Sequence, residues 1–118
     1  MGTEKKGTDF MNGVPELLIL RLLAHREMYG YEIVRGIRLS SNEQLNFGEG
    51  VIYPLLHAME KKRLIRTRRA TVNSRPRIYY RLTAKGQKKL QTTMSHWQQV
   101  TTTIQAILED SSDASETA

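Results

Sequence analysis

The sequence predicts a mainly α-helical domain with one two-stranded β-hairpin and a long final helix. Apolar residues recur at helical spacing in residues 14–25, 30–41 and 48–65. Alternating side chains mark two short strands within residues 64–82, and a heptad-like apolar repeat follows over 83–108. The chain has 118 residues and 39% hydrophobic content, which is enough for one core.

The first predicted helix, residues 14–25, is apolar on almost every side. Pro15 suits its first turn, where a backbone N–H has no partner in any case. The apolar side chains that follow are Leu17, Leu18, Ile19, Leu20, Leu22 and Leu23. Such a helix needs cover on two sides. We expect the domain core on one side and a second subunit or an extra helix on the other.

The second and third predicted helices each carry one apolar face. In residues 30–41 this face consists of Tyr31, Ile33, Val34 and Ile37, and in residues 48–65 of Ile52, Leu55, Leu56 and Met59. Pro54 is tolerated only near the first turn, so the third helix starts near Gly48 to Gly50. Its N-terminal end then carries free backbone N–H groups and the positive end of the helix dipole.

Two strands joined through residues 73–76 are predicted next. On the second strand Ile78, Tyr80 and Leu82 share one face, and Arg77, Tyr79 and Arg81 share the other. No Asn-Gly or Asp-Gly pair marks the turn. The hairpin is predicted to form a basic wing.

The last helix begins at the N-cap Thr83 and runs from Ala84 to about Leu108. Its predicted seam consists of Leu90, Met94, Trp97, Thr101, Ile104 and Leu108. About three heptads are marginal in isolation. We therefore expect these residues to form a dimer interface, to which the first helix contributes.

Charge is distributed unevenly along the chain. The formal net charge is +6, yet residues 109–118 hold four of the twelve acidic residues and no basic one. Residues 61–89 hold twelve Lys and Arg and no acidic residue. Like charges at this density repel one another, which predicts a polyanion partner. Residues 1–9 and 109–118 lack apolar periodicity and are predicted to be disordered.

Composition disfavours several classes of function. Without cysteine the chain forms no disulfide, thiolate zinc site or cysteine nucleophile. The three histidines lie far apart, and Gly48 and Gly50 lack the third glycine of a dinucleotide loop, so no metal or cofactor is predicted. Glu16 and Arg21 interrupt the longest apolar run, which is too short to cross a membrane. The expectation is a cytoplasmic protein that is not an enzyme.

Three helices, a basic wing and a dimerising helix follow the order of a winged helix-turn-helix domain. This DNA-binding domain is predicted over residues 10–82, with the dimerisation helix over 83–108. The second helix of such a pair enters the major groove of duplex DNA. Here that helix begins near Gly48, after a connection from Ser41 to Phe47 that is longer than in a tight helix-turn-helix.

Two sets of side chains are therefore predicted to contact a double-stranded DNA operator. The recognition-helix set, which contacts base edges or the flanking backbone, consists of Val51, Tyr53, Pro54, His57 and Lys61. The wing set, which contacts phosphates without sequence choice, consists of Arg66, Arg68, Arg69, Arg75 and Arg77. Phosphate contacts position a protein on DNA, whereas base contacts specify the sequence.

The strings MYGYEI, GVIYPLLHAME and YYRLTAKG carry a resemblance to a known family. In order and spacing they resemble the PadR family of bacterial transcriptional regulators, over residues 13–108. The single C-terminal helix resembles the smaller branch of that family. Val51 and Ile52 stand where Thr-Leu is more usual, which bears on base preference and not on the fold.

The resemblance implies a homodimeric repressor that a small-molecule effector releases from DNA. Some small members hold flat hydrophobic compounds in a pore at the dimer centre, lined by the C-terminal helices and a tryptophan. Trp97 falls at that position, although it could equally pack only on its dimer mate. The effector pocket implied in this way includes Phe10, Val14, Met94 and Trp97. Thr101 offers no counter-charge, so a planar neutral compound is expected.

Other functions remain open at this stage. A basic RNA-binding module would stack bases on exposed aromatics; Tyr29, Tyr53 and Tyr79 are candidates, but no predicted sheet face collects them. A dimeric interaction protein would have lost duplex binding, and a small hydrolase would need a catalytic constellation in a cleft. Preference for duplex over single strands separates the first alternative from a DNA-binding regulator.

Overall fold

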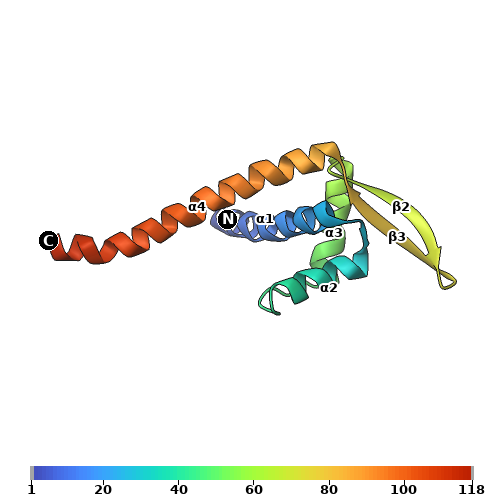
Figure 1. The fold of residues 1–118 in the computed structure, drawn as a ribbon, viewed down its shortest axis with the longest axis horizontal. Coiled ribbons are helices and arrows are strands. Elements are labelled where there is room, and N and C mark those ends of the chain that lie inside the picture. Colours follow the sequence, from blue (N-terminus) through green and yellow to red (C-terminus); the bar gives the residue numbers. More distant parts are fainter. Residues whose placement is uncertain (1, 118) are drawn as a thin grey trace.

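The computed structural model describes the backbone of residues 2–117 and the side chains of residues 13–110. Its elements are α1 (Gly2–His25), β1 (Met28–Tyr29), α2 (Gly30–Ser40), α3 (Glu49–Lys61), β2 (Ile65–Val72), β3 (Arg75–Leu82) and α4 (Ala84–Thr117). Figure 1 shows three helices clustered beside a protruding hairpin, with α4 running back over α1 and past it. The predicted mainly helical fold with a wing and a long final helix is confirmed.

The sheet has three antiparallel strands in the order β1-β3-β2. The short strand β1 pairs Met28 with Tyr80 and Tyr29 with Tyr79. Strand β1 was not predicted from the sequence, because two residues are too few to show an alternating pattern. Its pairing ties the wing to the start of α2, which follows β1 directly.

The core lies between α1, α2, α3 and the inner face of the sheet. Its completely or almost completely buried residues include Ile19, Leu20, Ile33, Ile52, Leu56, Met59, Ile65 and Tyr80. Leu90 of α4 is also buried within the single chain, at 1% exposure. The sequence placed Leu90 in the dimer seam, whereas in the structure it joins α4 to its own domain.

The hairpin turn consists of Asn73 and Ser74 alone. Their φ values are 52° and 64°, as a two-residue type I′ turn requires. The register pairs Ile65 with Leu82 at the base of the wing and Val72 with Arg75 at its tip. Asn tolerates this left-handed conformation, so the tight turn forms without glycine.

Helices α1 and α4 are longer than the sequence predicted, since they extend from Gly2 and to Thr117. The side chains of residues 2–12 and 111–117 lie outside those described, and the disorder predicted for residues 1–9 and 109–118 stays a prediction. The molecule measures 69 × 33 × 28 Å, and α4 accounts for its length (Figure 1). Within the described part of the chain, no helix is long and apolar enough for a membrane span.

Candidate nucleic-acid interface

Helix α3 starts where the sequence placed it, after the N-cap Gly48. The backbone N–H groups of Val51 and Ile52 both donate to the Gly48 carbonyl at 3.1 Å. Ile52 is fully buried, whereas Val51 is 42% exposed and Pro54 is exposed beside it. The start of α3 therefore presents a small apolar surface to solvent, at the end of the helix that carries the positive end of the dipole.

Tyr53 is half-buried and packs against the beginning of α2. A Cβ atom at Gly30 would lie 2.5 Å from the Tyr53 hydroxyl, so only glycine permits this approach. Burial raises the pKa of Tyr53, and the nearby Glu49 carboxylate raises it further. The phenol thus remains a neutral hydrogen-bond donor at physiological pH, and its ring positions α3 relative to α2.

A groove of about 580 Å³ separates α3 from the wing. Tyr53 and His57 line it from α3, and Arg75, Pro76 and Ile78 line it from β3. Four of the five predicted recognition-helix residues lie in the exposed first half of α3 and the turn that follows it. Lys61 does not, because it lies at the opposite end of the helix.

The outer face of the wing carries most of its arginines. By register, Arg66 faces Arg81, Arg68 faces Tyr79, Ala70 faces Arg77 and Val72 faces Arg75. Arg69 points to the other face, beside Ile78. The predicted wing set is therefore divided between the two faces of the hairpin, with Arg69 on the side of α3.

Three tyrosines support the outer face of the sheet. The rings of Tyr29 and Tyr79 meet edge to face at 5.7 Å, and Tyr31 stacks on Tyr29 at 6.4 Å. The Arg77 guanidinium lies 4.3 Å from the centre of the Tyr29 ring, and Arg68 lies 4.7 Å from that of Tyr79. Of the three tyrosines considered for base stacking, Tyr29 and Tyr79 do share a sheet face, because β1 adds Tyr29 to the sheet, whereas Tyr53 lies on α3.

Arg68 has a second partner, which sequence analysis missed. Its Nε donates to both carboxylate oxygens of Glu27, at 3.0 and 3.1 Å, and its Nη2 donates to Oε1. This hydrogen bonding lowers the pKa of Glu27 and raises the pKa of Arg68. Of the wing set, Arg66, Arg69 and Arg75 are exposed and form no ion pair with any residue whose side chain is described.

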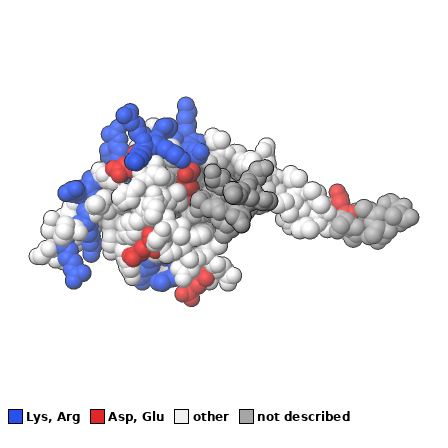
Figure 2. Space-filling view, turned by 180° about the vertical axis from the view of Figure 1, so that it is seen from behind, with Lys and Arg blue, Asp and Glu red and all other residues white. Residues whose placement is uncertain are grey.

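Lys and Arg form two large groups on the surface shown in Figure 2, and a smaller group lies at its lower edge. One large group follows the wing. The other large group covers the end of the molecule where α3 ends and α4 begins, and we call it the basic head. Its exposed members are Lys61, Lys62, Arg63, Lys85, Lys88 and Lys89, together with Arg66 of the predicted wing set, which lies at the base of the hairpin and not at its tip.

The predicted seam of α4 is largely open in the single chain. Met94, Ile104 and Leu108 are 39%, 50% and 69% exposed, whereas Trp97 is half-buried. The Thr101 hydroxyl donates to the Trp97 carbonyl at 2.9 Å, so it is engaged with its own helix. Toward the C-terminal end of the described part, the apolar stripe is thus exposed to solvent.

The implied effector pocket is only partly described. The side chain of Phe10 lies outside the described residues, and Val14 is half-buried on α1. Helices α1 and α4 of the same chain pack against each other (Figure 1), which places Val14, Met94 and Trp97 on neighbouring helices. A cavity at the dimer centre would require a second subunit to close it.

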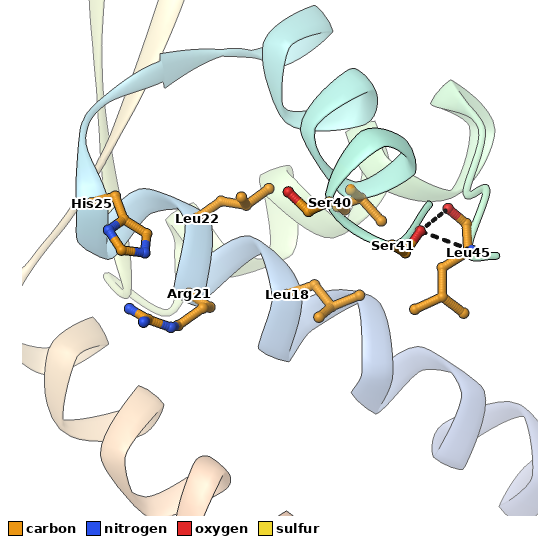
Figure 3. A pocket seen from close by; sticks show the side chains of 8 residues that line it. Leu18, Arg21, Leu22, His25, Ser40, Ser41 and Leu45 are labelled. Atoms are coloured by element: carbon orange, nitrogen blue, oxygen red, sulfur yellow. Dashed lines mark hydrogen bonds between the residues drawn. The ribbon is translucent and has the colours of Figure 1, made fainter. Parts of the chain in front are cut away.

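A separate apolar pocket of about 310 Å³ lies between α1 and α2 (Figure 3). Leu18 and Leu22 of α1 face Leu45 across it, and Ser40 and Ser41 form its far wall. The Ser41 hydroxyl donates to the Leu45 carbonyl at 3.2 Å and accepts from the Leu45 N–H at 3.0 Å. The sequence pattern gives no sign of this pocket, because its residues come from two separate segments of the chain.

Among residues whose side chains are described, no cluster of His, Asp or Glu is arranged to hold a metal ion. The His57 ring lines the groove beside α3, whereas His25 lines the α1–α2 pocket. The groove, the sheet face and the basic surface together suit a polyanion.

Comparisons with known proteins agree with this geometry. The Transcriptional regulator PadR-like family matches residues 19–92. A PadR-like transcriptional regulator from Bacillus cereus is 33% identical, with 85% of this chain and 96% of that chain covered and a TM-score of 0.73. A transcriptional regulator from Clostridium thermocellum is 28% identical, with 83% and 96% covered and a TM-score of 0.76. An uncharacterized protein of Lysinibacillus sphaericus is 30% identical over 103 residues, 86% of this chain and 94% of that protein.

These matches and the winged fold define a class of DNA-binding regulators. The chain belongs to the PadR-like family of transcriptional regulators.

Proposed function

We propose that the protein binds an operator as a homodimer and represses transcription until a small hydrophobic effector releases it. The observation that carries DNA reading is the exposed start of α3 beside the wing, with a groove of about 580 Å³ between them. Val51 and Pro54 approach base edges in the major groove, and Arg69 and Arg75 contact phosphates.

The arrangement favours duplex DNA over single-stranded RNA. An RNA-binding sheet stacks splayed bases on open aromatic faces. Here a guanidinium already lies over each of the Tyr29 and Tyr79 rings. Arg77 and Arg68 are thereby held by stacking, which suits phosphate contacts at fixed positions.

The open stripe of α4 supports dimerisation. Ile104, Ile107 and Leu108 are 50%, 63% and 69% exposed and repeat at helical spacing. A lone helix that projects from a small domain needs a partner for such a stripe. We propose that α4 packs against α4 and α1 of a second copy. The two copies of α3 then lie about 34 Å apart and match half-sites one helical turn apart.

We further propose an effector site at the dimer centre around Trp97, with Val14, Met94 and Phe10 beside it. Its indole offers a planar compound stacking worth roughly 0.5 to 1.5 kcal/mol beyond area burial. An effector releases the operator only if it binds the DNA-incompetent dimer more tightly than the competent one.

Two titrations test these proposals. Duplex from the region upstream of the gene is titrated with protein, and we expect a dimer that prefers it to its separated strands. Planar neutral compounds are then screened by Trp97 fluorescence, because this is the only tryptophan in the chain. Compounds that quench Trp97 are expected to weaken operator binding. If Trp97→Ala abolishes the dimer while Trp97→Phe behaves as wild type and nothing quenches, the residue is structural and the effector site is wrong.

A further inference from the structure

The basic head lies at the end of the molecule opposite the proposed DNA-reading surface, which consists of the start of α3 and the tip of the wing. Helix α3 has 13 residues, so its two ends are about 18 Å apart. In Figure 1 the start of α3 and the tip of the wing lie on one side, and the start of α4 lies on the other. A straight duplex held by the reading surface therefore leaves the head in solvent.

At the end of α3, the head has an arginine where glycine is usual. The Arg63 N–H donates to the Glu60 carbonyl at 2.9 Å, and the Leu64 N–H donates to the Met59 carbonyl at 3.0 Å. These bonds form a Schellman motif, in which the residue with positive φ is usually glycine. Here that residue is Arg63, with a φ of 62°. Glycine would adopt this φ without strain, so Arg63 makes the fold less stable than glycine would at this position.

At the start of α4, the head has positive charge where negative charge is preferred. Helix α4 has no acidic residue in its first turn, where the dipole stabilises carboxylates. It has Lys85 there and Lys88 and Lys89 one turn later. The Lys85 ammonium donates to the Lys62 carbonyl at 2.8 Å, which joins the two ends of the head. Positions 85, 88 and 89 share one face of α4, about 5 to 6 Å apart.

A cleft of about 580 Å³ lies at the base of the hairpin, within the head. Arg63, Arg66 and Lys85 line it together with the hydroxyl residue Thr67. Glu60 is the acidic residue of this lining, and it accepts a hydrogen bond from the Thr67 hydroxyl at 2.9 Å. The cleft therefore combines three cations with one carboxylate that already has a partner.

The described acidic residues near the end of α4, Glu109 and Asp110, lie far from the head. Glu109 lies 21 residues after Lys88 on α4, which corresponds to about 32 Å along a helix. Figure 1 shows α4 leading away from the head toward the C-terminus. The positive charge of the head is thus available to another molecule.

We propose that the basic head binds the sugar–phosphate backbone of a second DNA duplex, so that an operator-bound dimer holds two duplexes together. This rests on the proposed function, operator binding by the opposite surface. Five of the seven head residues are lysines, which act as point charges without the directional fork of arginine. A row of such charges suits the regular phosphates of a duplex, at about one charge per 3.4 Å of axis on each strand.

The experiment measures capture of a second duplex. Operator duplex is fixed to beads and saturated with protein, and a fluorescent duplex of unrelated sequence is added at two salt concentrations. We expect wild type to retain it, less at the higher salt. The head variant is Arg63→Gly with Lys88→Gln, and the matched wing variant is Arg69→Gln with Arg75→Gln. Each pair removes two positive charges.

The head variant is expected to bind operator within about twofold of wild type and to retain about tenfold less second duplex, because it lacks two phosphate contacts. Each lost contact is also expected to lower the salt slope of capture by about 0.9. Its Tm is expected to be unchanged or higher, because glycine adopts the positive φ at position 63 without strain. The wing variant is expected to lose operator affinity yet retain the usual amount of second duplex per bound protein.

Three results would overturn the inference. If wild type captures no second duplex while binding operator, the head has no such role and the proposed function stands. If head and wing variants lose operator affinity equally, the head belongs to the operator surface. If polyglutamate displaces the captured duplex at lower charge concentration than free duplex does, the head is a site for acidic protein. Failure of wild type to bind operator contradicts the proposed function instead.

Discussion

The wing and the basic head are both rich in positive charge, but they hold it differently. On the wing, Arg68 and Arg77 lie over tyrosine rings, and Arg68 is also fixed by Glu27. On the head, lysines project from helix ends and Arg63 occupies a conformation that suits glycine. Fixed guanidinium groups suit contacts at defined positions, whereas flexible ammonium groups suit attraction without register. Charge count alone does not reveal this difference.

The largest expected effect concerns the packing of the start of α4 against Leu64, next to the head. A Cβ atom at Gly86 would clash with the Leu64 carbonyl oxygen, a backbone atom that has little freedom to move. We expect Gly86→Ala to lower the free energy of unfolding by about 2 to 3 kcal/mol, in spite of the better helix propensity of alanine. Urea denaturation measures this.

The matched control is Gly50→Ala on α3, where no atom lies within 4 Å of the added Cβ. That change is expected to leave stability unchanged or to raise it by up to about 1 kcal/mol. Equal losses at both positions would show that α4 does not meet Leu64 as described.

A second prediction concerns how the reading surface is positioned. Gly30→Ala places a Cβ atom 2.5 Å from the Tyr53 hydroxyl and displaces the ring. We expect about tenfold weaker operator binding, equivalent to about 1.4 kcal/mol. In a double-mutant cycle with Tyr53→Ala, the two losses are expected to be strongly non-additive because the residues touch. Additive losses would mean that Gly30 acts through something other than Tyr53.

The third prediction separates charge from stability on the head. Arg63→Gly relieves a positive φ of 62° and is expected to raise the free energy of unfolding by about 1 kcal/mol. Arg63→Ala is the control, because it removes the same charge and keeps the backbone strain. A lower Tm for Arg63→Gly than for Arg63→Ala would show that the positive φ is not a source of strain.

The smallest effect is a pH dependence of the wing. Hydrogen bonding from Arg68 lowers the pKa of Glu27 in the folded state. The stabilisation is therefore present above the ordinary carboxyl range and is lost as pH falls through the lowered pKa. We expect wild type to exceed Glu27→Gln slightly in Tm at pH 7, and the gap to close as pH falls below about 4. A gap that stays constant with pH would place the effect elsewhere.

Much of the fold followed from periodicity, because each amphipathic face had a clear spacing. The start of α3 followed from Pro54 and the glycines before it, and the two faces of β3 followed from alternation. What escaped prediction depended on contacts between distant segments. Strand β1 has only two residues, and Glu27 meets Arg68 across 41 positions. Leu90 matched the heptad spacing but is buried in its own domain, since spacing identifies an apolar face and not the surface that covers it.

The sequence predicted a basic surface but not its separation into two groups. The sequence grouped twelve basic residues between Lys61 and Lys89 as a single polyanion surface. The structure separates them into two groups. Helix α3 runs from the DNA-reading surface to the head, and β2 runs from the head to the tip of the wing. Lys61 shares a helix with the predicted base-contacting residues, but the 13-residue length of α3 places it at the opposite end. Position along an element mattered as much as the face.

The most direct test of the reading surface is the salt dependence of operator binding. Affinity for the upstream duplex is measured at several salt concentrations for wild type and for Arg69→Gln with Arg75→Gln. Two lost phosphate contacts are expected to reduce the log–log slope by about 1.8 and to weaken all duplexes alike. An unchanged slope and affinity, or equal binding of single strands by wild type, would contradict a reading surface formed by α3 and the wing.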